Sequence, residues 1–139
     1  MISFTYQAPK AGYNIDEIAI KKWIKNTIIA EGKKVGDIQY ILCNDSQLHM
    51  INKRFLNHNT FTDIITFPST EYKGIISGDI YISLDRVIEN STEHNTTFVD
   101  ELNRVMVHGV LHLLGYKDST PSEKKQMRSK EDYYLHLRT

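Results

Sequence analysis

Four short segments of the chain have the pattern of β-strands, in which apolar residues alternate with polar ones or form a brief apolar run. These segments are residues 2–6, 37–43, 64–67 and 75–83. In the second of them, Ile38, Tyr40 and Leu42 fall on one face. Pro68 ends the third, and the fourth contains the turn-like sequence Ser77-Gly78-Asp79. The pattern therefore predicts a small sheet.

Five other segments have apolar residues every three or four positions, which is the period of a helix with one buried face. We expect helices from 14 to about 32, from 45 or 46 to 56, from 83 or 84 to about 95, from 97 to 115 and from 120 to about 137. The first is expected to bury Ile15, Ile18, Trp23, Ile24 and Ile28. The last has the clearest start, because Thr120, Pro121 and Glu123 form a capping box with proline in the first turn. Residues 57–60 have the composition of a turn.

Strands and helices follow one another without strict alternation, so we expect an α+β fold: a small mixed β-sheet flanked by helices. The 139 residues suffice for one hydrophobic core and contain no linker, so we expect a single domain over residues 1–139. No signal peptide and no membrane-spanning apolar run is evident. The lone cysteine, Cys43, cannot form an intrachain disulfide, and we interpret it as a buried thiol in a reducing, cytoplasmic compartment.

The segment that indicates chemistry is His108-Gly109-Val110-Leu111-His112-Leu113-Leu114-Gly115-Tyr116-Lys117-Asp118. Residues four apart lie on one face of a helix, so both imidazoles can point at one ion. Gly115 can end the helix and turn the chain, which would allow Asp118 to return as a third ligand. Three protein ligands with an open position for water are typical of catalytic rather than structural zinc. Alternatively, one histidine makes an ordinary polar contact, the other is a partly buried core residue, and Asp118 is a turn residue near the start of the next helix.

Two other classes of metal enzyme share part of this pattern. Zinc peptidases carry a general-base glutamate directly after the first histidine, where this chain has Gly109. Two histidines and a carboxylate also occur in non-haem iron oxygenases, but nothing in the sequence indicates their barrel scaffold. The remaining histidines, His49, His58, His94 and His136, lack ligand spacing and are interpreted as surface residues.

Three segments together resemble the YbeY family of single-strand endoribonucleases. Residues 108–118 resemble its metal motif, H-G-x-L-H-L-x-G-Y-D-H. Asn52 and Thr62-Asp63-Ile64-Ile65-Thr66-Phe67-Pro68 resemble its L-N…T-D-V-L-S-F-P segment, and Ser77-Gly78-Asp79-Ile80-Tyr81-Ile82-Ser83 resembles its G-D-I-x-I-S strand. The order and spacing of the three segments match those of the family.

The resemblance implies a zinc-dependent endoribonuclease of the bacterial cytoplasm. Its substrate would be single-stranded RNA, including the 3′ end of the small-subunit (16S) rRNA precursor, and it would also act in ribosome quality control. Its partners would be the ribosome and its assembly factors. Asp63 and Asp79 would be candidates to orient a ligand imidazole, or would make only turn and strand-end hydrogen bonds. Thr66 and Ser77 would be candidates to line the cleft.

The chain departs from the family pattern at three positions. Asp118 stands in place of the third histidine ligand. A carboxylate is a harder ligand than imidazole, so the site still suits zinc and becomes more favourable for Mn²⁺, Fe²⁺ or Ni²⁺. Lys117 replaces the aspartate before that ligand. Leu56 occupies the position of an arginine that would stabilise charge on the phosphoryl oxygens. Either Arg54 or Lys117 provides that charge as a catalytic residue, or the role is missing.

Three functions therefore compete. The first is a metal-dependent endoribonuclease with His108, His112 and Asp118 as metal ligands. The second is a metal-dependent peptidase or amidohydrolase, which would need a carboxylate base elsewhere. The third is a non-enzymatic, ribosome-associated module with a structural metal. The third stays open because of the missing arginine and the net charge of zero, from 17 basic and 17 acidic residues, which argues against binding RNA through the overall field. A three-ligand site with an open position argues against it, because that is unusual for structural zinc.

Overall fold

The computed structural model of the protein describes residues 1–8, 14–56, 62–69 and 73–138. In chain order, their elements are β1 (Ile2–Tyr6), α1 (Glu17–Ala30), β2 (Lys34–Cys43), α2 (Asp45–Leu56), β3 (Ile64–Ser69), β4 (Ile75–Ser83), α3 (Leu84–Glu93), α4 (Phe98–Leu113) and α5 (Pro121–His136). The predicted α+β class is confirmed. The turn predicted at residues 57–60, with His58, lies outside the described residues.

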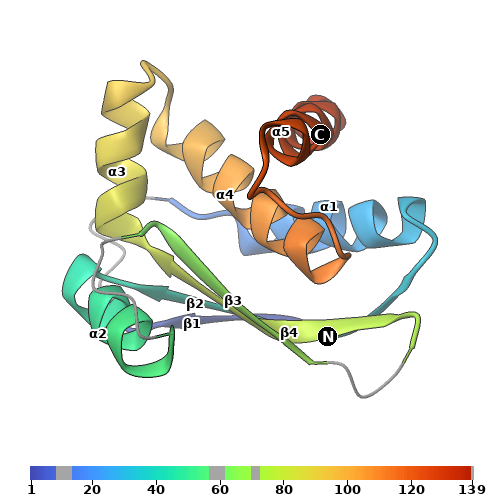
Figure 1. The fold of residues 1–139 in the computed structure, drawn as a ribbon, viewed down its shortest axis with the longest axis horizontal. Helices are drawn as coiled ribbons and strands as arrows, with labels where there is room; N and C mark the ends of the chain where they lie inside the picture. The colour runs from blue at the N-terminus through green and yellow to red at the C-terminus, as the bar shows by residue number, and fades with distance from the viewer. Residues whose placement is uncertain (9–13, 57–61, 70–72, 139) are drawn as a thin grey trace.

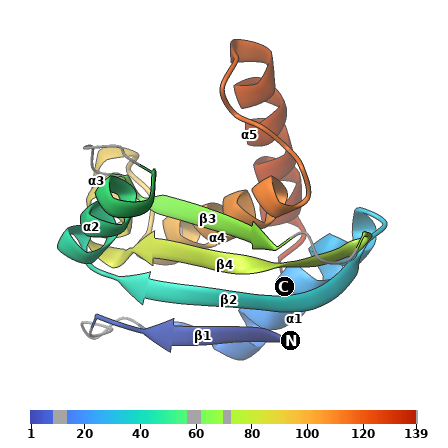
Figure 2. The same cartoon turned by 60° about the horizontal axis from the view of Figure 1, so that its bottom comes forward.

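The strands form one mixed sheet in the order β1-β2-β4-β3. β1 and β4 both run parallel to β2, whereas β3 runs antiparallel to β4 and forms one edge of the sheet (Figure 2). Pro68 was expected to end the third strand, but β3 continues to Ser69. Proline is tolerated there because an edge strand does not need every backbone N–H for pairing.

The two faces of the sheet are covered by different helices. Figure 1 shows α1, α4 and α5 on one side and α2 on the other. Along β4, Ile80 and Ile82 point into the large core shared with α1 and α4. Tyr81, between them in sequence, packs instead with Ile65 and Leu48 in a smaller cluster with α2. The alternation of strand side chains thus determines which helix each residue contacts.

Helix α1 buries a different face from the one predicted at its start. Ile20, Trp23, Ile24 and Ile28 are buried, but Ile18 is 84% exposed. A helix rotates by about 100° per residue, so Ile18 and Ile20 lie on nearly opposite sides. The prediction for Ile18 was therefore wrong. With apolar residues at both 18 and 20, the sequence allows either side of the helix to face the core, and the packing against the sheet selects the side that carries Ile20.

Cys43 is buried at the end of β2, as the sequence indicated. Burial, with smaller contributions from Asp45 and Asp85, raises the pKa of its thiol to about 11. Among the described residues, no helix is both long enough and apolar enough to span a membrane.

At Gly109 the backbone of α4 lies against side chains of the sheet and leaves no room for a Cβ atom. A Cβ atom at this position would be 2.9 Å from Ile64 Cδ1 and 2.9 Å from Ile80 Cγ2, which is closer than real Cβ contacts allow. Gly109 is also the residue directly after His108. The same contact that packs α4 against β3 and β4 therefore determines the height of the histidines above the sheet.

We predict that Gly109→Ala destabilises the protein by about 1–3 kcal/mol, because the added methyl group overpacks a closed interface. Helix propensity alone would give the opposite sign, since alanine is favoured over glycine by about 1 kcal/mol in a helix. Urea unfolding of the metal-free protein measures the difference. A stabilised variant would show that α4 does not need this close approach.

Candidate metal centre

Helix α4 presents two histidines on one face. Thr97 caps its start by accepting a hydrogen bond from the Asp100 N–H at 3.1 Å, and the helix then runs without interruption to Leu113. His108 and His112 lie one turn apart, near its end. Their Nε2 atoms are 3.0 Å apart, and their rings meet edge to face. The predicted convergence of the two imidazoles is thus present in the fold.

The chain reverses direction directly after α4. Gly115 adopts φ +106°, a conformation that L-residues with a side chain rarely take. The Gly115 N–H donates to the His112 carbonyl and the Tyr116 N–H donates to the Leu111 carbonyl, both at 3.0 Å. This helix ending brings Asp118 back toward the histidines. Its Oδ2 lies 3.2 Å from His108 Nε2 and 3.3 Å from His112 Nε2.

These three donor atoms fit one small divalent ion. Tetrahedral coordination with bonds of 2.0–2.2 Å separates its ligand atoms by about 3.3–3.6 Å. The separations of 3.0, 3.2 and 3.3 Å are close to that range. The three side chains are half-buried, with 20%, 26% and 39% of their surfaces exposed. His108, His112 and Asp118 therefore have the geometry to hold a metal ion.

The other nitrogen of each ring faces an acceptor. His108 Nδ1 lies 2.6 Å from Glu131 Oε2, and His112 Nδ1 lies 3.0 Å from the Tyr116 carbonyl oxygen. Acceptors at these positions favour the tautomer that carries its proton on Nδ1. When both rings are neutral, two unprotonated Nε2 atoms and a carboxylate face one another at close range. A cation between them removes this repulsion, which is why the donor set suits a metal.

Glu131, on α5, is a site residue that the sequence reasoning missed. Its side chain is only 6% exposed, and Glu131 Oε1 also accepts a hydrogen bond from Arg104 Nη1 at 2.8 Å. Arg104 Nη2 pairs in turn with Asp132, which is 58% exposed. The one signal in the sequence was that Glu131 falls four residues after Met127 and so on the same, buried face of α5. The pattern did not indicate that this face of α5 would pack against His108.

Carboxylates around His108 influence its protonation. Burial would lower the pKa of His108, but the hydrogen bond and charge of Glu131, with the charges of Asp118 and Asp63, outweigh it and raise the pKa. Burial raises the pKa of Asp63, and the charge of His108 partly offsets that increase. Asp63, just before β3, is therefore close enough to His108 for their charges to interact. Asp63 remains a candidate to orient the imidazole of His108.

Other residues suggested by the sequence lie elsewhere. Asp79 is exposed on β4, between Gly78 and Ile80, so it points to the face opposite α4. Ser77 accepts a hydrogen bond from the Asp37 N–H at 3.0 Å and, with Asp79, lines a groove of about 730 Å³ at the end of the sheet that includes none of the three candidate ligands. Thr66 lies two residues after Ile64 on β3, so both side chains point to the same face of the sheet, the one covered by α4.

The two candidate catalytic cations are on opposite sides of the sheet. Lys117 is exposed in the turn that carries Asp118. Arg54 is exposed near the end of α2, with its guanidinium 5.8 Å from the centre of the Phe55 ring. Because α2 packs on the face opposite α4, the fold brings Lys117 but not α2 to the side of the sheet that carries the histidines.

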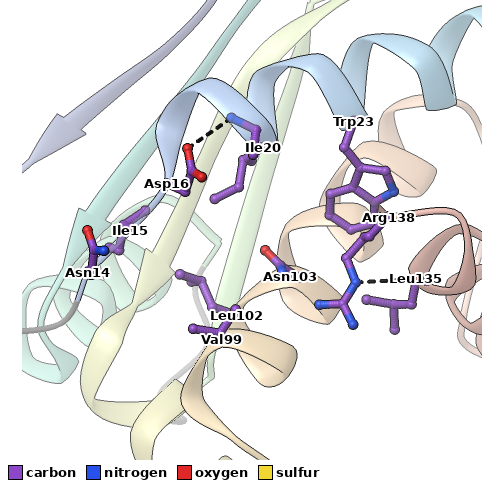
Figure 3. A pocket seen from close by; sticks show the side chains of 11 residues that line it. Asn14, Ile15, Asp16, Ile20, Trp23, Val99, Leu102, Asn103, Leu135 and Arg138 are labelled. Atoms are coloured by element: carbon purple, nitrogen blue, oxygen red, sulfur yellow. Dashed lines mark hydrogen bonds between the residues drawn. The ribbon is translucent and has the colours of Figure 1, made fainter.

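A separate cavity of about 470 Å³ lies between the starts of α1 and α4 and the end of α5 (Figure 3). Trp23 and Leu102 contribute apolar lining, and Asn103 and Arg138 contribute polar groups. None of the three candidate ligands lines it. The cavity is therefore distinct from the metal centre.

Known proteins similar to this chain form one consistent group. The family model described as endoribonuclease YbeY matches residues 5–138. The endoribonuclease YbeY of Flavobacterium johnsoniae is 45% identical over 133 residues, covering 95% of this chain and 93% of that protein. The one from Cytophaga hutchinsonii is 48% identical over 119 residues, covering 86% and 83%. The solution structure of TM1509 from Thermotoga maritima superimposes with a TM-score of 0.67 at 28% identity, covering 98% of this chain and 87% of that one.

We predict that Glu131→Gln weakens zinc binding by about 10–100-fold, because the amide loses the charge that orients His108 and makes it a better ligand. Competition with a chromogenic chelator measures the affinity. Asp132→Asn is the matched control, since Asp132 pairs with the same arginine but does not contact a histidine. Equal affinities for wild type and Glu131→Gln would exclude this role of Glu131.

Proposed function

The chain belongs to the YbeY family of endoribonucleases, and from this premise we propose that it hydrolyses single-stranded RNA with one divalent metal ion, zinc, held by His108, His112 and Asp118. The observation that carries the proposal is the convergence of three donor atoms within 4.8 Å of one another. When bound, the ion would activate a water molecule and offset charge on the phosphate. The donor set of two nitrogens and one oxygen suits zinc, and the carboxylate also tolerates Mn²⁺, Fe²⁺ or Ni²⁺.

The residues of the chain contribute orientation and charge. Glu131 and the Tyr116 carbonyl hold the Nδ1 protons of the two histidines, which leaves both Nε2 atoms directed at the ion. We propose that Lys117, beside Asp118, contacts the phosphate at the cleavage site and stabilises its charge in the transition state. Arg54, on the other side of the sheet, is better placed to contact the phosphate backbone beyond the cleaved bond.

The biological substrate is proposed from the family resemblance. It is the precursor of the small-subunit rRNA at its 3′ end, together with RNA of defective ribosomes. The protein would then act in the cytoplasm with the ribosome and its assembly factors. Zero net charge is consistent with a nuclease that relies on a partner to bring it to its substrate rather than on its own field.

Two alternative functions are less well supported. A zinc peptidase would carry glutamate in place of Gly109, but a side chain there would collide with Ile64 and Ile80. The helix face that would hold the base is thus occupied by the sheet. A structural metal would normally have four protein ligands, whereas the group has three among the described residues. Hydrolysis of RNA is therefore the function that the geometry supports best.

We predict that His112→Ala abolishes cleavage of a labelled single-stranded RNA together with bound metal, because one of three ligands is lost. His136→Ala, at an exposed histidine of α5, is the control and should cleave like wild type. Metal content is measured on the same samples, prepared without a histidine tag. Cleavage that persists in metal-free His112→Ala would contradict the proposal.

Lys117→Ala should lower kcat for the same RNA by about tenfold or more while metal affinity stays unchanged, since the lost ammonium acts on the phosphate and not on the ion. Lys124→Ala is the matched control, because Lys124 is also an exposed lysine but lies on α5 rather than in the turn. If both variants retain the wild-type kcat, Lys117 has no catalytic role.

A further inference from the structure

Glu31 lies at the end of α1 and contacts the segment that carries the third ligand. It is the C-cap residue of α1, and its backbone N–H donates to carbonyls of the last helical turn. Its side chain is 13% exposed. The carboxylate points toward the turn between α4 and α5, 85 residues away in sequence. Nothing in the metal motif indicates this residue.

The carboxylate of Glu31 receives three hydrogen bonds from two segments. Tyr116 OH donates to Oε1 at 2.5 Å, Tyr134 OH donates to Oε2, and Lys130 Nζ donates to Oε2 at 3.2 Å. Burial alone would raise the pKa of Glu31, but these hydrogen bonds and the lysine charge outweigh it and lower the pKa. Glu31 is therefore a carboxylate at neutral pH and joins the end of α1 to the turn and to α5.

Tyr116 connects this cluster directly to the metal centre. Its hydroxyl contacts Glu31, and its backbone carbonyl accepts the Nδ1 proton of His112. Lys130 also lies over the Tyr116 ring, 5.3 Å from its centre. Asp118 follows only two residues later. A tyrosine fixed at both its hydroxyl and its backbone thus leaves Asp118 little freedom to move away from the histidines.

The turn is held at its two ends by local hydrogen bonds: the Tyr116 N–H donates to the Leu111 carbonyl, and the Ser119 N–H donates to Glu123 Oε1 at 3.2 Å. The contact between Tyr116 and Glu31 adds an anchor to a distant helix. Gly115, Lys117 and Ser119 are exposed. Fixing the backbone of one residue costs about 1–2 kcal/mol of conformational entropy, so a loose turn would subtract several such contributions from metal affinity. Contacts that order the turn in advance remove that cost from the binding step.

We propose that Glu31 is a positioning residue of the metal centre: by holding Tyr116, Lys130 and Tyr134, it orders the turn that carries Asp118 and orients His112. The inference rests on the metal-dependent function proposed above. On α5, the adjacent residues Lys130 and Glu131 extend the cluster, because Lys130 contacts Glu31 and Glu131 contacts His108. Glu31 thereby acts on Asp118 and His112 through the turn, and Lys130 joins it to the helix that carries the partner of His108.

The chain contains a matched control on the same helix. Glu17, in the first turn of α1, accepts a hydrogen bond from Tyr6 OH at 2.8 Å and lies 4.0 Å from Lys21 Nζ. This cluster has the same chemical partners, a tyrosine and a lysine, but it joins α1 to β1. Glu17→Gln therefore reproduces the loss of a tyrosine–carboxylate contact without touching the turn after α4.

The test compares zinc affinity, by chelator competition, for wild type, Glu31→Gln and Glu17→Gln. We expect Glu31→Gln to weaken zinc binding by about tenfold and Glu17→Gln to leave it within about twofold of wild type. Tyr116→Phe, which removes a single hydroxyl, should weaken binding in the same direction and provides the test if Glu31→Gln folds poorly. Amide hydrogen exchange of the metal-free proteins should be faster for residues 114–119 in Glu31→Gln and Tyr116→Phe only.

The outcomes separate this inference from the proposed function. Wild-type zinc affinity in both Glu31→Gln and Tyr116→Phe would overturn the role of Glu31 and leave the nuclease proposal intact. An equal loss in Glu17→Gln would also overturn it, because the effect would then reflect general stability. Failure of the wild-type protein to bind any divalent metal would overturn the proposed function and this inference together.

Discussion

The close packing of α4 on β3 and β4 is the constraint on which the rest of the structure depends. Gly109 permits this approach, since any side chain there would collide with Ile64 and Ile80. One residue earlier and three residues later, His108 and His112 emerge from the edge of the same interface. A helix displaced outward by a larger residue would move both imidazoles relative to α5 and the following turn, which carry their partners. Core packing and ligand geometry are therefore two consequences of one contact.

Polar contacts from the following turn and from two other helices orient the donor atoms of the candidate metal centre. Glu131 from α5 and the Tyr116 carbonyl determine which nitrogen of each imidazole carries the proton. Glu31 from α1 anchors the turn that carries Asp118. The three candidate ligands come from eleven consecutive residues, and the Tyr116 carbonyl lies among them, but Glu131 and Glu31 come from helices that are distant in sequence. Local spacing supplies the donor atoms, and the surrounding helices supply their orientation.

The same geometry explains why a histidine pair of this spacing need not indicate a peptidase. In that class the residue after the first histidine provides a base, so the helix must leave room on that side. Here that side is closed by the sheet, and the cations available for catalysis are instead exposed. Lys117 lies beside the third ligand, and Arg54 lies across the sheet on α2. This arrangement suits an extended, negatively charged substrate that contacts more than one face of the protein.

The sequence by itself determined what depends on neighbours along the chain. Periodicity located the strands and helices, and Thr120 and Glu123 defined the start of α5. The spacing of His108, His112, Gly115 and Asp118 was enough to predict that the three donor atoms converge. The tertiary structure decided the strand order, the exposure of Ile18, the position of Arg54 on α2, and the roles of Glu131 and Glu31. Each of these depends on residues tens of positions apart, which come together only when helices cross over a sheet. Local periodicity contains no information on such crossings, because the same amphipathic pattern packs equally well against several partners.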